Sequence, residues 1–167
     1  VEPSAAADVL EAVLESADGS RDVTVHRETA EAFDLASEVE AGGPFDLVIF
    51  GNVLNELDEP AAVLARYLDG LAEDGTVLAL EPADRNTATG LREIERAVAD
   101  DGPASVYAPT VRLWPHQSPN SESWSFEKRP DIEVPAMQRR LDDPAGGTGE
   151  FVNVDVQFAY SLLRTDG

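Results

Sequence analysis

The sequence predicts a single α/β domain built around a mostly parallel sheet. Two nearly continuous apolar runs, 45–50 and 76–80, are typical of strands that are covered on both faces. Helical patterns of roughly ten to thirteen residues alternate with the strand patterns, as in repeated βαβ units. A length of 167 residues suits one core, and we find no internal repeat and no linker that would divide the chain.

The first part of the chain predicts two helical segments around a short strand. Ser4 is the predicted N-cap of the first helix, in which apolar residues recur at helical spacing over 9–14. The Asp-Gly-Ser run at 18–20 ends that helix. Valines then alternate with polar residues over 22–26, as in a strand, and 28–40 predicts a weaker helix or a loop.

The remainder of the chain continues this alternation. The strand at 45–50 is followed by a helix over 60–71, which a proline opens. The strand at 76–80 is followed by a helix over 89–99, and the last strand spans 152–163.

Charge is the most unusual property of the sequence. Asp and Glu total 33 against 12 Lys and Arg, so the formal net charge is -21. Hydrophobic residues make up 43%, too many for a disordered acidic tail, so the charge coats a folded body. Lys128 is the only lysine. This composition is typical of salt-accumulating halophiles, where a Debye length of roughly 3 Å or less screens the repulsion; a mesophilic acidic protein is the alternative.

The residue types present exclude several kinds of site. Without cysteine there is no disulfide, thiolate zinc site, iron–sulfur cluster or cysteine nucleophile. The two histidines, His26 and His116, are too few for a three-histidine metal site, so we expect no metal. No apolar run approaches the ~20 residues of a membrane span, and no signal peptide opens the chain. We therefore expect a cytoplasmic protein of a halophilic prokaryote, with no membrane partner.

Polar residues follow three of the predicted strands, at the end where open α/β sheets bind ligands. Glu2 lies where the start of the chain reads as the end of a strand, Gly51 and Asn52 follow the strand at 45–50, and Glu81 follows the strand at 76–80. A carboxylate in such a place can accept both hydroxyls of a ribose, or it can simply favour the N-terminus of the next helix. A glycine there lets a ligand approach the backbone, or it makes a plain turn.

Some of these segments resemble a known family. The run Phe-Asp-Leu-Val-Ile-Phe-Gly-Asn-Val-Leu-Asn-Glu-Leu at 45–57 resembles the fourth strand and following loop of class I S-adenosylmethionine-dependent methyltransferases. Its Val-Leu-Asn-Glu-Leu portion is similar to the ribosome-associated methyltransferase-like family of mitochondrial small-subunit proteins and their prokaryotic relatives. Residues 75–82, which end in Glu-Pro, resemble that family's next strand, and 1–4 resemble the end of its second strand.

The resemblance implies a Rossmann-like class I methyltransferase sheet with an antiparallel last strand, and a chain that lacks the first strand and helix of that fold. It implies S-adenosylmethionine as the cofactor. Glu2 would hold its ribose, Glu28 and Thr29 would lie near its adenine, and Gly51 and Asn52 would line its methionine end. Methyl transfer depends mainly on positioning, so we assign no general base. The substrate-side candidates are Asn55, Glu56 and Glu81.

Two departures from the family pattern bear on activity. The glycine-rich first strand and loop, which holds the methionine part of the cofactor, is missing. The glycine cluster at 146–149 precedes the last strand and predicts a hairpin loop rather than a phosphate loop, so we expect this chain alone to be inactive. Family cysteines that would hold a metal cluster are replaced nearby by Thr110, Ser118 and Ser125, so we expect no metal cluster.

An irregular insertion at 101–150 departs from the acidic average. It holds seven of the eleven prolines and both tryptophans, and its segments 107–109, 115–116 and 124–126 resemble the family's insertion. Five basic against four acidic residues give 111–140 a net charge of +1. Arginines beside aromatic rings suit RNA phosphates and unpaired bases; alternatively, they pair with carboxylates while the tryptophans fill the core. The RNA-binding candidates are Arg112, Trp114, His116, Trp124, Arg129, Arg139 and Arg140.

Three functions remain open on the sequence. The first is an S-adenosylmethionine-dependent methyltransferase that acts on or with ribosomal RNA or the small ribosomal subunit. The second is a catalytically inactive ribosome-assembly or RNA-binding factor that retains the methyltransferase fold. The third is an α/β ligand-binding domain without a ribosomal role.

Overall fold

The computed structural model describes residues 1–16, 22–100, 102–109, 116, 126–142, 152 and 155–166. The chain divides into two compact units, 1–45 and 46–167.

The described residues of the first unit form two helices, α1 (Ala6–Ser16) and α2 (Leu35–Gly42). Ser4 caps α1 as predicted, because its Oγ accepts a hydrogen bond of 3.1 Å from the backbone N–H of Ala6. The carboxylate of Asp34 caps α2 in the same way, since it accepts the N–H of Ser37 at 3.2 Å. Of the predicted range 28–40, only the second half is helical, and the helix continues to Gly42.

The prediction of a strand at 22–26 is wrong. Residues 22–27 have no strand assignment. The backbone bond described for this segment runs from the N–H of Glu2 to the carbonyl of His26, at 2.9 Å. A single bond of this kind does not make a ladder, so alternation of valines with polar residues was not sufficient to form a strand here.

The second unit is built on a five-stranded sheet. Its order is β1 (Phe45–Gly51), β2 (Leu71–Pro82), β5 (Val156–Arg164) and β3 (Ser105–Ala108), and β4 (Glu127–Arg129) pairs with β5 as well. The predicted strands at 45–50, 76–80 and 152–163 are thus confirmed in type, with shifted ends.

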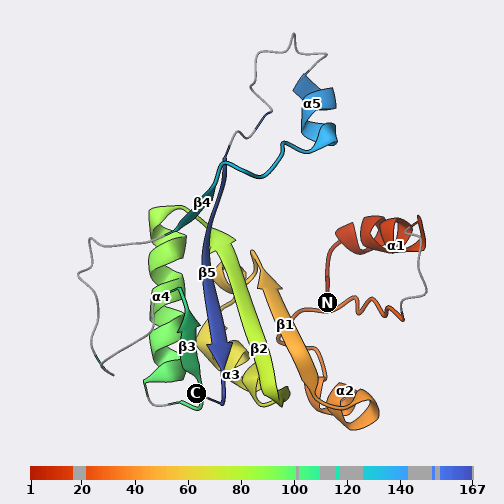
Figure 1. Cartoon of the computed structure of the whole chain (residues 1–167). Helices are drawn as coiled ribbons and strands as arrows, with labels where there is room; N and C mark the ends of the chain where they lie inside the picture. Colours follow the sequence, from red (N-terminus) through yellow and green to blue (C-terminus); the bar gives the residue numbers. More distant parts are fainter. Residues whose placement is uncertain are drawn as a thin grey trace. The chain divides into compact units, whose positions relative to one another are not determined.

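The direction of β5 makes the sheet mixed. β5 is antiparallel to β2, β3 and β4, whereas the arrows of β1 and β2 point the same way (Figure 1). The predicted antiparallel last strand is confirmed. Because this strand lies between β2 and β3, most of the described ladders are antiparallel, although the other strands share one direction.

Helices α3 (Pro60–Leu68) and α4 (Arg85–Ala99) pack against each other, and both contact β2. α3 ends three residues before the predicted Leu71, because the chain turns at Gly70, whose N–H bonds to the carbonyl of Tyr67. α4 begins four residues before the predicted Thr89. Asp84 starts it, since its carboxylate accepts the N–H of Thr87 at 3.0 Å.

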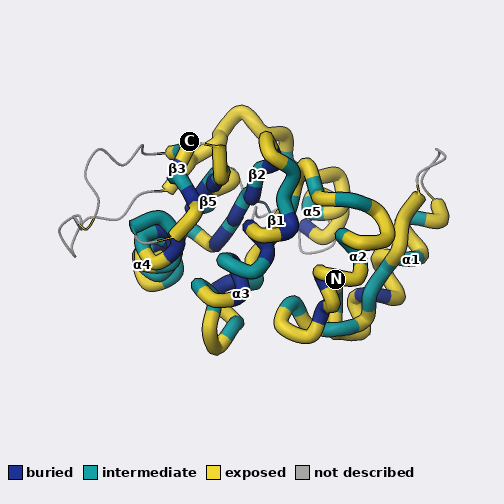
Figure 2. Tube along the Cα trace, turned by 90° about the horizontal axis from the view of Figure 1, so that it is seen from below, coloured by how far each residue is buried: buried dark blue, intermediate teal, exposed yellow. Residues whose placement is uncertain are grey.

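The core of this unit lies between the sheet and these two helices. Figure 2 shows buried residues along β2, β5, α3 and α4. The most deeply buried large side chains of these four elements include Leu64, Val77, Leu91 and Leu163. The prediction that 45–50 is covered on both faces is wrong for one face of β1: Leu47 and Ile49 are 51% and 57% exposed.

The predicted irregular insertion at 101–150 is described only in part. Besides β3 and β4, it contributes the short helix α5 (Ala136–Asp142). The glycine cluster at 146–149 and the residues Thr110, Ser118 and Ser125 lie outside the described residues.

Candidate functional site

The chain leaves β1 through a turn at Gly51 and Asn52. Asn52 has a φ of 56°, in the left-handed region that asparagine tolerates better than most residues. Its N–H donates a 2.8 Å hydrogen bond to the carbonyl of Leu80, near the end of β2. This geometry starts a one-turn 3-10 helix, η1 (Leu54–Glu56), beside the end of the neighbouring strand.

Glu81, the second-last residue of β2, ties this turn to the sheet. Its side chain is almost wholly buried, and its Oε1 accepts a 2.8 Å hydrogen bond from the backbone N–H of Leu54. Burial raises the pKa of Glu81 above its ordinary value. The hydrogen bond from the N–H of Leu54 opposes this rise, as do the neighbouring N–H groups of Asn55 and Val53, and the nearby carboxylate of Glu56 adds to it. Glu81 thus acts as an internal acceptor for the turn.

A cavity of about 380 Å³ lies beside this turn. Its walls come from η1 and the segment leading into α3, from the end of β2 and from one face of α4. The apolar part consists of leucines, a proline and an isoleucine, and the polar part consists of amides, a hydroxyl and carboxylates. The polar lining residues are Asn55, Glu81, Asn86, Thr87 and Glu93.

Two of the three substrate-side candidates therefore lie in one cavity. Asn55 and Glu81 line it, while Glu56 acts on it through its charge, which raises the pKa of Glu81. The predicted Gly51 and Asn52 form the turn itself and are exposed.

Residues of α4 were missed by the sequence interpretation. Asn86, Thr87 and Glu93 lie on the face of α4 that lines the cavity. The available signal was the polar run at 84–87, directly after the Glu-Pro end of β2. Because Asp84 caps the helix, that run belongs to the first turn of α4 rather than to a loop.

The predicted cofactor residues fall in both units. Glu2, Glu28 and Thr29 belong to 1–45, whereas Gly51 and Asn52 belong to 46–167. Their roles on S-adenosylmethionine therefore stay predictions.

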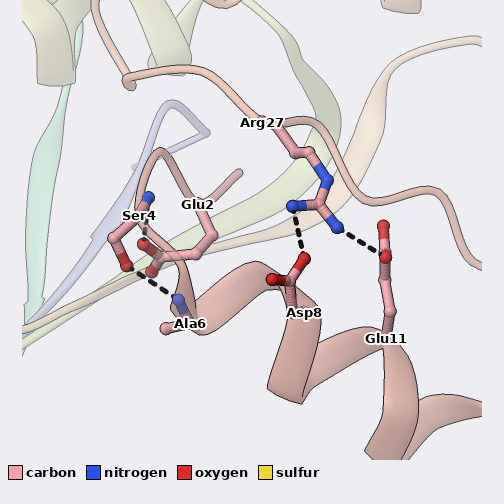
Figure 3. Close-up of polar contacts among 6 residues, drawn as sticks. All are labelled: Glu2, Ser4, Ala6, Asp8, Glu11 and Arg27. Atoms are coloured by element: carbon pink, nitrogen blue, oxygen red, sulfur yellow. Dashed lines mark hydrogen bonds and ion pairs between the residues drawn. The ribbon is translucent and has the colours of Figure 1, made fainter.

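Glu2 has a local partner at the start of α1 (Figure 3). Its Oε1 accepts a 2.8 Å hydrogen bond from the N–H of Ser4. The hydrogen bonds from Ser4 hold the pKa of Glu2 below its ordinary value, so the side chain is ionised at neutral pH. This contact corresponds to the helix-end role that the sequence left open for Glu2.

Arg27 holds the next turn of α1 in the same view (Figure 3). Its guanidinium lies 2.7 Å from an oxygen of Asp8 and 2.6 Å from an oxygen of Glu11. Thr29, a predicted adenine neighbour, also makes a local contact, because its Oγ1 accepts the N–H of Ala32 at 3.2 Å. Glu28 lies 3.6 Å from the imidazole of His26. The first unit is thus cross-linked by its own polar side chains.

The RNA-binding candidates divide into four groups. Arg129 is held by the carboxylate of Asp131 through two hydrogen bonds, 2.8 and 2.6 Å long, which corresponds to the pairing alternative. Arg139 and Arg140 lie in the last turn of α5 and are exposed. The Nδ1 of His116 lies 4.0 Å from a carboxylate oxygen of Asp100. The remaining candidates, Arg112, Trp114 and Trp124, lie outside the described residues.

Two other features do not occur in the described part of the chain. There, no three acidic or histidine side chains gather in a way that could hold a metal ion. None of the described helices has the length and apolar character needed to cross a bilayer. Comparison with protein-family models, with curated proteins and with solved structures gave no significant match.

Proposed function

We propose that this chain is an S-adenosylmethionine-dependent methyltransferase-like protein that acts on or with ribosomal RNA or the small ribosomal subunit. The observation that carries the proposal is the turn after β1, which Glu81 holds beside a cavity at the ends of β1 and β2. In open α/β sheets, ligands bind outside the carboxyl ends of the strands. The two segments that meet there, 45–57 and 75–82, are those that carry the family resemblance.

The course of the sheet also supports the proposal. A class I methyltransferase sheet has an antiparallel last strand, and β5 is antiparallel to β2 over seven residue pairs, from Thr76–Arg164 to Pro82–Phe158. Helices α3 and α4 follow β1 and β2 in the alternating order of such a fold. A Rossmann-like sheet is therefore the fold that we propose for residues 46–167.

The residues proposed to hold S-adenosylmethionine suit its parts. A Cβ added to Gly51 would meet no atom within 4 Å, so the space beside this backbone is open to a ligand. The ionised carboxylate of Glu2 can accept hydrogen bonds from ribose hydroxyls. When bound, the cofactor supplies an electrophilic methyl group, and the chain's task is to orient the cofactor and its acceptor.

Calorimetry with S-adenosylmethionine tests this proposal. We expect binding in KCl above about 1 M, where the repulsion between carboxylates is screened. Glu2→Ala should weaken the affinity about tenfold, as expected for lost hydrogen bonds to a charged group. Asp22→Ala, an exposed carboxylate in the same unit, is the matched control and should leave the affinity unchanged. Absence of binding by the wild-type chain at every salt concentration would count against a cofactor-dependent function.

An inactive RNA-binding or assembly factor is the second candidate. It is favoured by the local hydrogen bonds of Glu2 and Thr29, because side chains used to cap helices and turns need no ligand to explain them. RNA binding without S-adenosylmethionine binding, measured on the same preparation, would establish this candidate over the first.

A further inference from the structure

The cavity beside η1 has an acidic lining. Among its lining residues two are carboxylates, Glu81 and Glu93, and none is basic. Glu56 adds a third negative charge close to Glu81. A phosphate or carboxylate ligand would meet repulsion here without a cationic partner, so the cavity suits a group that donates hydrogen bonds.

One acceptor of the cavity is left unused. Oε1 of Glu81 accepts the N–H of Leu54, but the buried Oε2 has no hydrogen-bond partner among the described residues. Of the residues that line the cavity, Glu81 alone has such an orphaned buried polar atom in the described structure. Buried acceptors in native proteins are normally paired, and an orphan of this kind points to a ligand group that completes it.

We propose that this cavity binds the amino-bearing edge of a nucleobase, such as cytosine or adenine, with the amino group donating a hydrogen bond to Oε2 of Glu81. The inference rests on the proposed function for the choice of RNA as the source of the base. It deepens that function, because it names the group that the substrate presents.

The walls favour a base over a protein side chain. Leu54, Leu57 and Leu91, with Pro60 and Ile94, form apolar surfaces that suit the faces of a flat ring. A lysine ammonium is strongly hydrated and loses that hydration on entering such a place. A neutral amino group keeps a single donor for Glu81 at a smaller desolvation cost. A volume of about 380 Å³ lies within the usual range for small-ligand cavities.

The side-chain amides on the rim extend this recognition. Asn55 and Asn86 line the cavity from η1 and from the first turn of α4. Each amide offers both a donor and an acceptor, which matches the mixed edge of a base better than the all-donor surface of a guanidinium. The described lining therefore matches a ligand with donors toward Glu81 and both donors and acceptors toward the rim.

The test compares cytidine with uridine on the whole chain, without cofactor, by NMR titration at pH 8.5. These nucleosides present an amino group and an oxo group, respectively, at the same place on the ring. We expect cytidine to bind roughly tenfold more tightly, as for one well-placed hydrogen bond, with shifts at the amides of Leu54, Asn55 and Gly90. Equal affinities, or shifts confined to other residues, would overturn the proposal.

Glu81→Gln gives the sharpest variant. Its amide oxygen can still accept the N–H of Leu54, while its NH₂ replaces the acceptor Oε2 with a donor. The preference should therefore reverse, with uridine binding more tightly than cytidine. Glu73→Gln makes the same chemical change at an exposed site on β2 and should keep the cytidine preference. A Glu81→Gln protein that still prefers cytidine would contradict the assignment of Oε2.

Gly90→Leu is a second variant that tests the same cavity if the Glu81→Gln protein does not fold. A Cβ on Gly90 meets no atom within 4 Å, so a leucine has room to extend from α4 into the cavity. It should weaken cytidine binding at least tenfold, and unchanged binding would overturn the site. N-acetylarginine amide is the final probe: tighter binding than cytidine at the same amides would replace the base with a peptide side chain.

The nucleoside titration is independent of the methyltransferase proposal. Cytidine binding in the absence of S-adenosylmethionine binding would retain the base site and reject the cofactor. The reverse result would retain the cofactor and reject the base site.

Discussion

Oε1 of Glu81 accepts a hydrogen bond of 2.8 Å from the backbone N–H of Leu54, 27 residues earlier in the chain. Both residues are at most 1% exposed. The bond joins the end of β2 to the turn after β1, so the polar residues that follow one strand are fixed against those that follow the other. Together with the hydrogen bond from the N–H of Asn52 to the carbonyl of Leu80, this contact fixes the candidate site.

Removing the acceptor should destabilise the second unit. Glu81→Ala leaves the buried N–H of Leu54 without its acceptor, so we expect the free energy of unfolding to fall by about 1–3 kcal/mol. Urea unfolding followed by circular dichroism measures this change. Glu81→Gln, which keeps an acceptor, should lose less. Glu73→Ala, which removes an exposed carboxylate of the same strand, should change the free energy of unfolding little. Equal losses at both positions would contradict a stabilising role for the hydrogen bond between Leu54 and Glu81.

The same carboxyl group predicts a pH dependence of stability. Burial raises the pKa of Glu81 above 4.5, so the folded state binds this proton more tightly than the unfolded state. Its contribution to stability is therefore complete below a pH of about 4.5 and is lost as the pH rises through the folded pKa.

Glu81→Gln removes this titration and leaves the other carboxylates in place. The free energy of unfolding of the wild type, minus that of Glu81→Gln, should fall as the pH rises from about 4.5 toward neutrality. Urea unfolding at a series of pH values gives the difference directly. A difference that is constant or that grows with pH would show that burial does not raise this pKa.

A pair of glycines tests the packing of α4 without touching a charge. Gly90 lies inside the helix with open space where a Cβ would stand, so Gly90→Ala should stabilise the protein by about 0.5–1 kcal/mol. Gly102→Ala is the matched control, because its Cβ would collide with the backbone carbonyl of Val98 and should destabilise. Thermal unfolding checks both signs, and a loss of stability in Gly90→Ala would contradict the open face of α4.

The arginines of the insertion should differ in their effect on RNA binding. Arg139 and Arg140 are exposed, whereas Arg129 is already bonded to Asp131 through both of its carboxylate oxygens. Replacing Arg139 and Arg140 together with alanine should lower RNA affinity about tenfold and reduce the salt slope by about two. Arg129→Ala should change affinity much less.

Fluorescence anisotropy with a ribosomal RNA fragment measures these affinities over a range of KCl. If Arg129→Ala lowers RNA affinity more than the double replacement does, the ion pair between Arg129 and Asp131 opens on binding. Arg129, rather than Arg139 and Arg140, is then the main RNA contact. If neither variant changes the affinity, the insertion does not contact RNA.

The sequence predicted those helices and strands that are determined by residues close to one another in the chain. The apolar runs at 45–50 and 76–80 became β1 and β2, and Pro60 opened α3 as expected for a proline at the first helical position. The strand at 22–26 failed, because alternation needs a partner strand that local patterning does not specify.

The candidate site was predictable only in part for a related reason. Asn55 and Glu81 could be found, because each follows a recognisable strand. Glu93 could not, and Asn86 was signalled only by the polar run at 84–87, since their face of α4 is defined only once the helix is known to start after Asp84. From that start, residues 86, 90 and 93 recur at helical spacing on the side that lines the cavity. The hydrogen bond between Glu81 and Leu54 is long-range and leaves no local pattern.

The most direct test of the central claim is an NMR titration of the chain with S-adenosylhomocysteine in high KCl. We expect saturable shifts at the amides of Gly51 and Asn52, while the amides of α5 stay unchanged. No shifts, or shifts that spare both Gly51 and Asn52, would contradict a cofactor site at the end of β1.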